Sequence, residues 1–258
     1  MIIDVAANET QITVGLITKS RTFLESEPWR VEPWSDFPSN EKTLQNHLVD
    51  ILAFVPGFLH DQMQVDLTKS HNDREQLIKC VQEKLDALFK WRYHWNRAHA
   101  NVTCELDTNA FPASRSLSTY RPFQTVLVYS SFTRATEISL YNAVLICLLG
   151  VLWSLKPPAA KQPAFCHSIL TLPHEVTSLR DPAIEICRTF EFQLSMVKQS
   201  HESTLFWLLP LGLASRILED DIRMSSWIKD MLDSSRVTRG YGTGASTYGF
   251  GNYKFPKI

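Results

Sequence analysis

Apolar residues recur along most of this chain with the 3.6-residue period of an α-helix. Residues 72–99 show the period most clearly, because their apolar positions form one stripe opposite a charged face. The stripe consists of Leu77, Val81, Leu85, Leu88 and Trp95. This pattern predicts a long, partly exposed helix.

Comparable patterns predict further helices over residues 39–55, 130–155, 180–200, 202–220 and 221–235. Pro56-Gly57 is expected to end the first of these helices, and Pro210 is expected to kink the fourth. Residues 101–122 are polar and contain two prolines, which is typical of a long loop. No alternating run of apolar and polar residues predicts a substantial sheet.

The predicted fold class is therefore all-α, a single irregular helical domain of about six or seven helices. We expect an extended N-terminal segment over residues 1–38 that docks on the body, and the helical domain itself over residues 39–236. Five of the nine glycines lie in the closing stretch 237–258, which is expected to form a Gly-rich tail.

The most apolar stretch, residues 138–155, contains no charged residue over 18 positions. This length is the lower limit for a helix that spans a membrane. Three polar residues interrupt the stretch, and Glu137 and Lys156 flank it closely. We therefore expect a helix buried in a soluble core and no membrane association.

Composition agrees with an ordinary soluble protein of 258 residues, 44% hydrophobic and 21% charged, with a net charge of −1. A pI near 6.7 argues against direct nucleic-acid binding, which normally needs a basic face. None of the five cysteines forms a C-x2-C pair, so no structural metal site is predicted. Reduced cysteines and the lack of a signal peptide favour the cytoplasm or the nucleus.

Catalytic motifs give no candidate residues. The tail motif GYGTGAS has neither the preceding strand nor the following helix of a phosphate-binding loop. The acidic run 219–221 lacks the one-turn spacing that a metal–diphosphate clamp needs, and is better explained as a helix end followed by a cap. The histidines form no H-E-x-x-H pattern. Neither a cofactor nor a metal is expected, and the catalytic residues are unknown.

Two acidic residues in apolar surroundings, Glu137 and Glu191, are more informative, because an isolated buried charge is costly. They are candidates for a polar patch in a cavity, with Arg134, Arg188 or Arg216 as partners. The alternative is an internal salt bridge or an acid that faces the surface.

Six short motifs occur in an order that resembles a known family. They are PWRVEPW (28–34) with VPGFL (55–59), LDALFKWRYHW (85–95), ATEISLYNAVLICLL (135–149), DPAIEICRTFEFQL (181–194), LFWLLPLGLA (205–214) and WIKDMLDSSRVTRGYGTG (227–244). Over residues 20–245 the chain resembles the helical regulatory region of fungal zinc-cluster transcription factors. The resemblance implies that Trp29 and Trp34 anchor the N-terminal segment on the helical body.

Members of that family carry a six-cysteine zinc cluster with a basic linker ahead of this region, and these 258 residues contain no such motif. We therefore do not expect this chain to read DNA itself. Three explanations stay open: a helical regulator that acts through a partner, an enzyme of specialised metabolism, or a chain that lost its zinc cluster through truncation or gene-model error.

The regulator is expected to bind an apolar small metabolite and to pair with a second copy of the chain or with a DNA-binding regulatory protein. The enzyme would be a cofactor-free cyclase, isomerase or pericyclase that folds a terpenoid or polyketide in its helical cavity. Polar atoms on the most apolar helices make Tyr141, Glu191, Trp207 and Arg216 the candidate ligand-binding residues. Alternatively, all four are ordinary core or salt-bridge residues.

Overall fold

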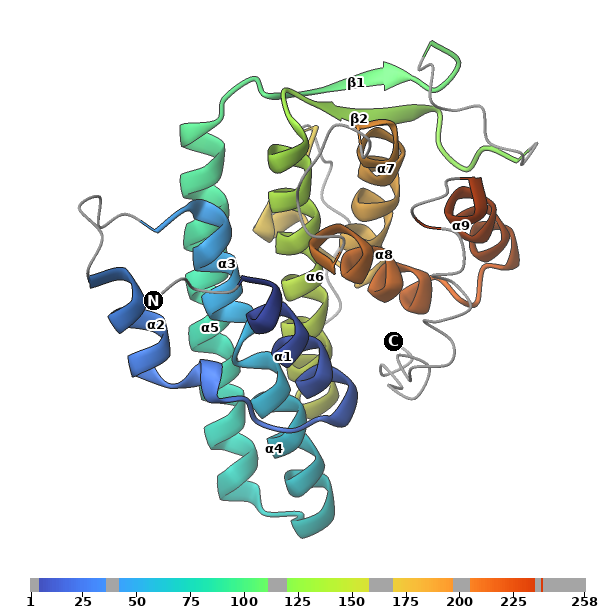
Figure 1. Ribbon diagram of the computed structural model, residues 1–258. Helices are drawn as coiled ribbons and strands as arrows, with labels where there is room; N and C mark the ends of the chain where they lie inside the picture. The colour runs from blue at the N-terminus through green and yellow to red at the C-terminus, as the bar shows by residue number, and fades with distance from the viewer. Residues whose placement is uncertain are drawn as a thin grey trace. The chain divides into compact units, whose positions relative to one another are not determined.

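The computed structural model describes residues 5–35, 42–110, 120–157, 169–196, 205–234 and Thr238. Over these residues the chain is all-α apart from one small β-hairpin (Figure 1). The helices are α1 (Val5–Thr18), α2 (Glu27–Ser35), α3 (Leu44–Leu52), α4 (Val55–Thr68), α5 (His71–Ala98), α6 (Phe132–Leu155), α7 (Arg180–Met196), α8 (Leu205–Ile217) and α9 (Ile222–Ser234). Two 3₁₀ turns, η1 (Phe23–Glu25) and η2 (Pro173–Glu175), and two antiparallel strands, β1 (Thr103–Asp107) and β2 (Thr125–Tyr129), complete the described elements.

The chain forms two compact units, each built from two stretches of sequence. Unit 1 comprises Met1–Trp95 and Cys147–Ala160, and unit 2 comprises Asn96–Ile146 and Lys161–Ile258. The long helix α6 contributes residues to both units. The predicted boundary between residues 38 and 39 falls inside unit 1.

Unit 1 is organised around a helical hairpin. Helices α4 and α5 are joined by Lys69 and Ser70 alone, and Lys69 adopts the left-handed conformation that ends α4. So short a connection makes the two helices antiparallel neighbours (Figure 1). Helix α1 packs against α4, and the Trp91 indole of α5 donates a hydrogen bond of 2.8 Å to the Leu44 carbonyl of α3.

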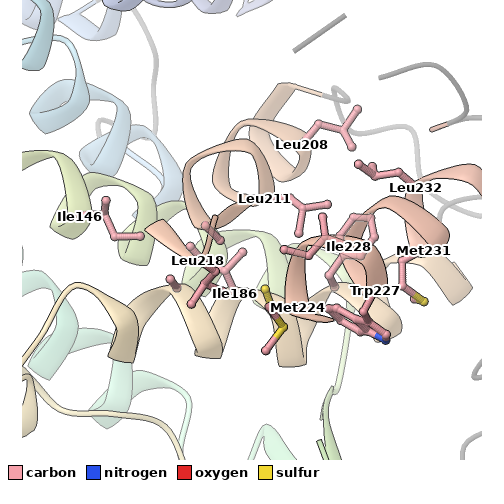
Figure 2. Close-up of a cluster of buried hydrophobic side chains, with 14 of the residues drawn as sticks. Ile146, Ile186, Leu208, Leu211, Leu218, Met224, Trp227, Ile228, Met231 and Leu232 are labelled. Atoms are coloured by element: carbon pink, nitrogen blue, oxygen red, sulfur yellow. The ribbon is translucent and has the colours of Figure 1, made fainter. Parts of the chain in front are cut away.

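Unit 2 has a core formed largely by the facing sides of α7, α8 and α9 (Figure 2). Figure 2 shows Leu211 of α8 next to Ile228 of α9, with Trp227 and Met224 on the same face of α9. The β1–β2 hairpin packs on α7 through β2. Arg188 of α7 fixes the hairpin, since its Nη2 donates to Glu105 Oε1 of β1 and to Thr125 Oγ1 of β2, each at 2.7 Å.

The prediction of an extended N-terminal segment is wrong, because residues 5–18 and 27–35 are helical. The apolar positions Ile12 and Leu16 are one helical turn apart and are both buried, so α1 is held by packing on one face. Trp29 does not anchor the segment: its side chain is 47% exposed and its ring contacts that of Phe23, which is equally exposed. The Trp34 side chain lies outside the described residues.

Pro56-Gly57 was expected to end a helix and instead begins one. Pro56 lies in the first turn of α4, where its missing N–H would have had no helical partner. The preceding helix, α3, begins after Thr43, whose hydroxyl accepts a hydrogen bond from Asn46 N. The predicted loop 101–122 also contains strand β1, which pairs with β2 beyond it.

Helix α6 confirms the apolar helix predicted near residues 130–155. By length and composition α6 is apolar enough to cross a membrane, yet 83% of its most apolar window is buried inside the protein. Such burial is that of a core helix and is compatible with a soluble protein. The predicted Gly-rich tail, residues 237–258, lies outside the described residues except for Thr238.

Candidate functional site

The four predicted ligand-binding residues all belong to helices of unit 2. Tyr141 of α6 and Glu191 of α7 are buried, with 1% and 5% of their surfaces exposed. Arg216 lies near the end of α8 and forms an ion pair with Glu219, one turn further along the chain. Trp207 is part of α8, but its side chain lies outside the described residues.

Helices α6 and α7 are joined by buried polar contacts in the region of Tyr141 and Glu191. Asn142 Nδ2 donates to Glu185 Oε1 at 2.8 Å, and the backbone N–H of Thr171 donates to Glu185 Oε2 at 2.6 Å. The two oxygens of this buried carboxylate therefore connect α7 to α6 and to the backbone at Thr171.

Glu137, which the sequence marked as a buried acid, forms an internal salt bridge. Its Oε2 lies 2.5 Å from Arg134 Nη1, and the same nitrogen lies 2.7 Å from His99 Nε2. Of the three predicted arginine partners, Arg134 pairs with Glu137. Arg188 and Arg216 form their ion pairs with Glu105 and Glu219.

A hollow with a volume of about 680 Å³ lies in unit 1, and none of the four predicted residues lines it. Its walls come from Arg21 and from Glu25 of η1, from Phe54 and the length of α4 as far as Val65, and from the first half of α5. The lining residues are Arg21, Glu25, Phe54, Phe58, Asp61, Gln64, Val65, Asp73, Gln76, Leu77, Cys80, Glu83 and Lys84. Its volume falls in the range typical of small-molecule sites. We call this feature the hairpin groove.

The hairpin groove follows one face of each helix of the α4–α5 hairpin. The contributing positions of α5 recur every three or four residues from Asp73 to Lys84, which corresponds to roughly 16 Å along the helix axis. Apolar side chains from both helices lie between these ends. At one end the rings of Phe54 and Phe58 are stacked, with their centroids 6.2 Å apart.

Arg21 links Glu25 of η1, on one wall of the groove, to Asp61 of α4. It forms ion pairs with Glu25 at 2.8 Å and with Asp61 at 2.5 Å, and its hydrogen bond to Glu25 is the main cause that raises the pKa of Arg21. The backbone of Gly57 makes room for this pair, because a Cβ there would lie 2.5 Å from Glu25 Oε2 and 2.9 Å from Arg21 Nη1.

Lys84 occupies the aromatic end of the groove. Its Nζ lies 3.6 Å from the centroid of the Phe54 ring, and the guanidinium carbon of Arg30 lies 4.9 Å from the same centroid. Burial is the largest cause that lowers the pKa of Lys84, and the positive charge of Arg30 lowers it further. The amine is therefore easier to deprotonate than that of a lysine in water.

Within the described ranges of the chain, no group of three or more His, Cys, Asp or Glu side chains is placed to hold a metal ion. Cys147 and Cys187 are buried, and burial raises the pKa of each thiol to about 12. Cys80 differs from them because it is half-buried and lines the hairpin groove.

Sequence reasoning missed the hairpin groove. It identified the buried stripe of α5 correctly, including Leu77, but gave no role to the neighbouring positions Cys80 and Lys84. The signal was weak, because a lysine beside an apolar stripe usually covers it with its carbon stem. Its contact with Phe54, 30 residues earlier, and its burial beside Arg30 set Lys84 apart, and both depend on the tertiary fold.

Comparison with known proteins found no match to this chain among protein-family models, curated proteins or solved structures.

Proposed function

We propose that this protein is a regulatory protein that binds a small molecule in the hairpin groove. The single observation that carries the proposal is a groove of about 680 Å³ that is lined by the segment between α1 and α2 and by the α4–α5 hairpin of the same unit. The order of the six sequence motifs supports a relationship to the helical regulatory region of fungal zinc-cluster transcription factors. In that setting, the bound molecule would be a metabolite of the regulated pathway.

The lining of the groove indicates the chemistry of the ligand. Apolar side chains, including Phe58, Val65 and Leu77, provide a surface for an apolar body. Charged side chains surround them, with four acidic residues against two basic ones. These charges favour a ligand with an apolar body and a neutral or cationic polar end, and disfavour an anion.

Ligand binding offers a simple means of signalling. Arg21 and Glu25 belong to the segment between α1 and α2, and the opposite wall belongs to the α4–α5 hairpin. A ligand that contacts both walls would stabilise their association, by about 2.7 kcal/mol at a concentration one hundred times its dissociation constant. A second copy of the chain or a DNA-binding regulatory protein, in the cytoplasm or nucleus, would respond to the stabilised state.

Deletion of the gene in its host, with transcripts and metabolites measured together, tests the regulatory role. If the protein is a regulator, the deletion should change the transcripts of a set of metabolic genes. No single intermediate should accumulate before the transcripts change. Accumulation of one intermediate with unchanged transcripts would overturn the proposal and identify a cofactor-free enzyme of the kind described above.

A substitution that fills the groove with a large side chain tests whether the ligand binds there. Gln76 lines the groove and is exposed, so Gln76→Trp places an indole in the ligand volume without disturbing the core. Gln82→Trp is the matched control, since Gln82 is exposed on the same helix outside the lining. We expect metabolites from the host to raise the melting temperature of wild type and Gln82→Trp, but not of Gln76→Trp. Equal responses from the two variants would place the ligand elsewhere.

A further inference from the structure

We infer that Lys84 is a covalent attachment site, at which the hairpin groove captures a neutral or cationic aldehyde as an imine. This inference rests on the proposed ligand-binding role of the groove and names the chemical class of its ligand. It assigns a reactive function to a residue that the sequence alone gives no reason to select.

The geometry places one amine beside a volume large enough for a ligand. Lys84 is half-buried, and its Nζ is positioned over the Phe54 ring at 3.6 Å within the lining of the 680 Å³ groove. The stacked ring of Phe58 and the side chain of Leu77 extend the apolar surface next to it. An aldehyde that packs its carbon body on this surface would bring its carbonyl group to Nζ.

The surroundings also lower the pKa of Lys84, so the uncharged amine, which is the nucleophilic form, is easier to reach than in a lysine in water. Two conditions are known to activate a lysine: removal from water and proximity to another cation. Both are met, because burial and the charge of Arg30 lower the pKa of Lys84. The nearby acidic residues, Glu83 first among them, and the face of the Phe54 ring favour the ammonium form, but burial is the largest influence on the pKa.

The charge of the groove selects among carbonyl compounds. Glu25, Asp61, Asp73 and Glu83 outnumber the basic Arg21 and Lys84 in the lining. Arg21 is already paired with Glu25 and Asp61, so it is not available to receive a ligand carboxylate. An anionic aldehyde would therefore meet repulsion that a neutral one avoids.

The reaction itself is balanced without a cofactor. Lys84 first gives its ammonium proton to solvent, and the Nζ lone pair then forms a bond to the carbonyl carbon. The oxygen takes up the π electrons and a proton, while the nitrogen gives up one proton, which yields a neutral carbinolamine. The hydroxyl group then leaves as water together with the remaining N–H proton, which forms the C=N bond of the imine, and hydrolysis reverses every step, as a reversible sensor requires.

The test uses the full chain, benzaldehyde as the probe and sodium cyanoborohydride to reduce the imine to a stable secondary amine. Peptide mass spectrometry measures labelling rates at Lys84 and at Lys79, an exposed lysine on the same helix that serves as an internal control. At pH 7 we expect Lys84 to react at least about tenfold faster than Lys79. The ratio should fall as the pH is raised, because the lowered pKa of Lys84 gives it less advantage once protonation no longer limits the reaction.

Three further measurements sharpen the result. 4-Carboxybenzaldehyde, the anionic counterpart of the probe, should label Lys84 more slowly than benzaldehyde does, with Lys79 little affected. Lys84→Arg keeps a cation over Phe54 and should remove the fast-labelling component, whereas Lys79→Arg should retain it. Arg30→Gln should slow labelling of Lys84 at pH 7 but not near pH 10.

Equal labelling of Lys84 and Lys79 at pH 7 would overturn the inference even if every variant failed to fold, because both rates come from the wild-type chain. That result would leave the proposed function standing if metabolites still raised the melting temperature of wild type and not of Gln76→Trp. Fast labelling of Lys84 without any transcript change on deletion would instead retain the covalent site and remove the regulatory role.

Discussion

Gly15 in helix α1 is a residue whose neighbours leave no space for a side chain. A Cβ at this position would lie 2.7 Å from Thr22 Cγ2 and 3.0 Å from Pro56 Cβ. Glycine normally weakens a helix, and its replacement by alanine typically gains about 0.5–1 kcal/mol. Here the clash reverses the sign, and we expect Gly15→Ala to lower the free energy of unfolding by about 1–3 kcal/mol in urea titrations.

The double variant Gly15→Ala with Thr22→Ser provides the control for this prediction. Serine removes the methyl group that clashes, so part of the lost stability should return. A Gly15→Ala protein more stable than wild type would show that α1 does not pack closely on the start of α4.

Glu185 is a second residue whose surroundings predict a clear effect of substitution on stability. Its two carboxylate oxygens accept hydrogen bonds from Asn142 Nδ2 and Thr171 N, and the residue is 4% exposed. Glu185→Ala leaves the buried Asn142 amide and the half-buried Thr171 N–H without this acceptor, so we expect a loss of about 2–4 kcal/mol in the free energy of unfolding.

Glu185→Gln is the matched variant. Its carbonyl oxygen can accept from Thr171 N, and its amide can donate to Asn142 once that side chain turns over and presents its oxygen. The glutamine variant should therefore retain most of the stability that alanine loses. Equal losses in chemical denaturation would contradict the role assigned to these two hydrogen bonds.

At the scale of secondary-structure elements, the start of α9 is where sequence and structure agree best. The sequence identified the acidic run 219–221 as a helix end followed by a cap, and Asp221 Oδ1 accepts hydrogen bonds from Arg223 N and Met224 N, each at 3.1 Å. We expect Asp221→Ala to cost about 1 kcal/mol of stability and Asp221→Asn to cost little.

Thermal unfolding followed by circular dichroism measures both variants at Asp221. The ion pairs of Arg180 with Asp220 and Asp221 are exposed and contribute little. Arg180→Gln is therefore expected to stay close to wild type. If Arg180→Gln were as destabilising as Asp221→Ala, charge pairing and not capping would hold the start of this helix.

At the scale of the whole molecule, the division into two units cuts across the order of the chain. Unit 1 requires Cys147–Ala160 in addition to Met1–Trp95. The end of α6 supplies Ser154, whose hydroxyl receives a 2.6 Å hydrogen bond from Gln62, and the Leu155 carbonyl, which accepts one from Arg74. It also supplies the buried side chain of Val151.

We therefore expect a fragment of residues 1–95 to lack a cooperative thermal transition, because the α4–α5 hairpin loses part of its packing surface. Circular dichroism of this fragment, alone and with a peptide of residues 147–157, measures the effect. The peptide should increase the helical signal beyond the sum of the two components. A transition of the fragment alone at the melting temperature of the full chain would contradict the two-stretch composition of unit 1.

The sequence by itself determined the features that depend on neighbouring residues. Period and caps gave the all-α class, the long helices α5 and α6 and the cap at Asp221, because these signals act within one or two turns of a helix. The same locality explains the error at Pro56-Gly57, since a proline that ends one helix and a proline that begins the next look identical in sequence.

Only the tertiary structure decided which side chains from distant elements meet. The hairpin pairing of β1 with β2, the exposure of Trp29 and the ion pair of Glu137 with Arg134 each depend on packing around the residue concerned. The hairpin groove is the clearest example, because its lining residues Arg21, Phe54 and Lys84 lie 30 or more residues apart in the chain and are brought together only by the fold. Periodicity fixes which face of a helix is apolar, but contact free energies across the fold decide what that face adjoins.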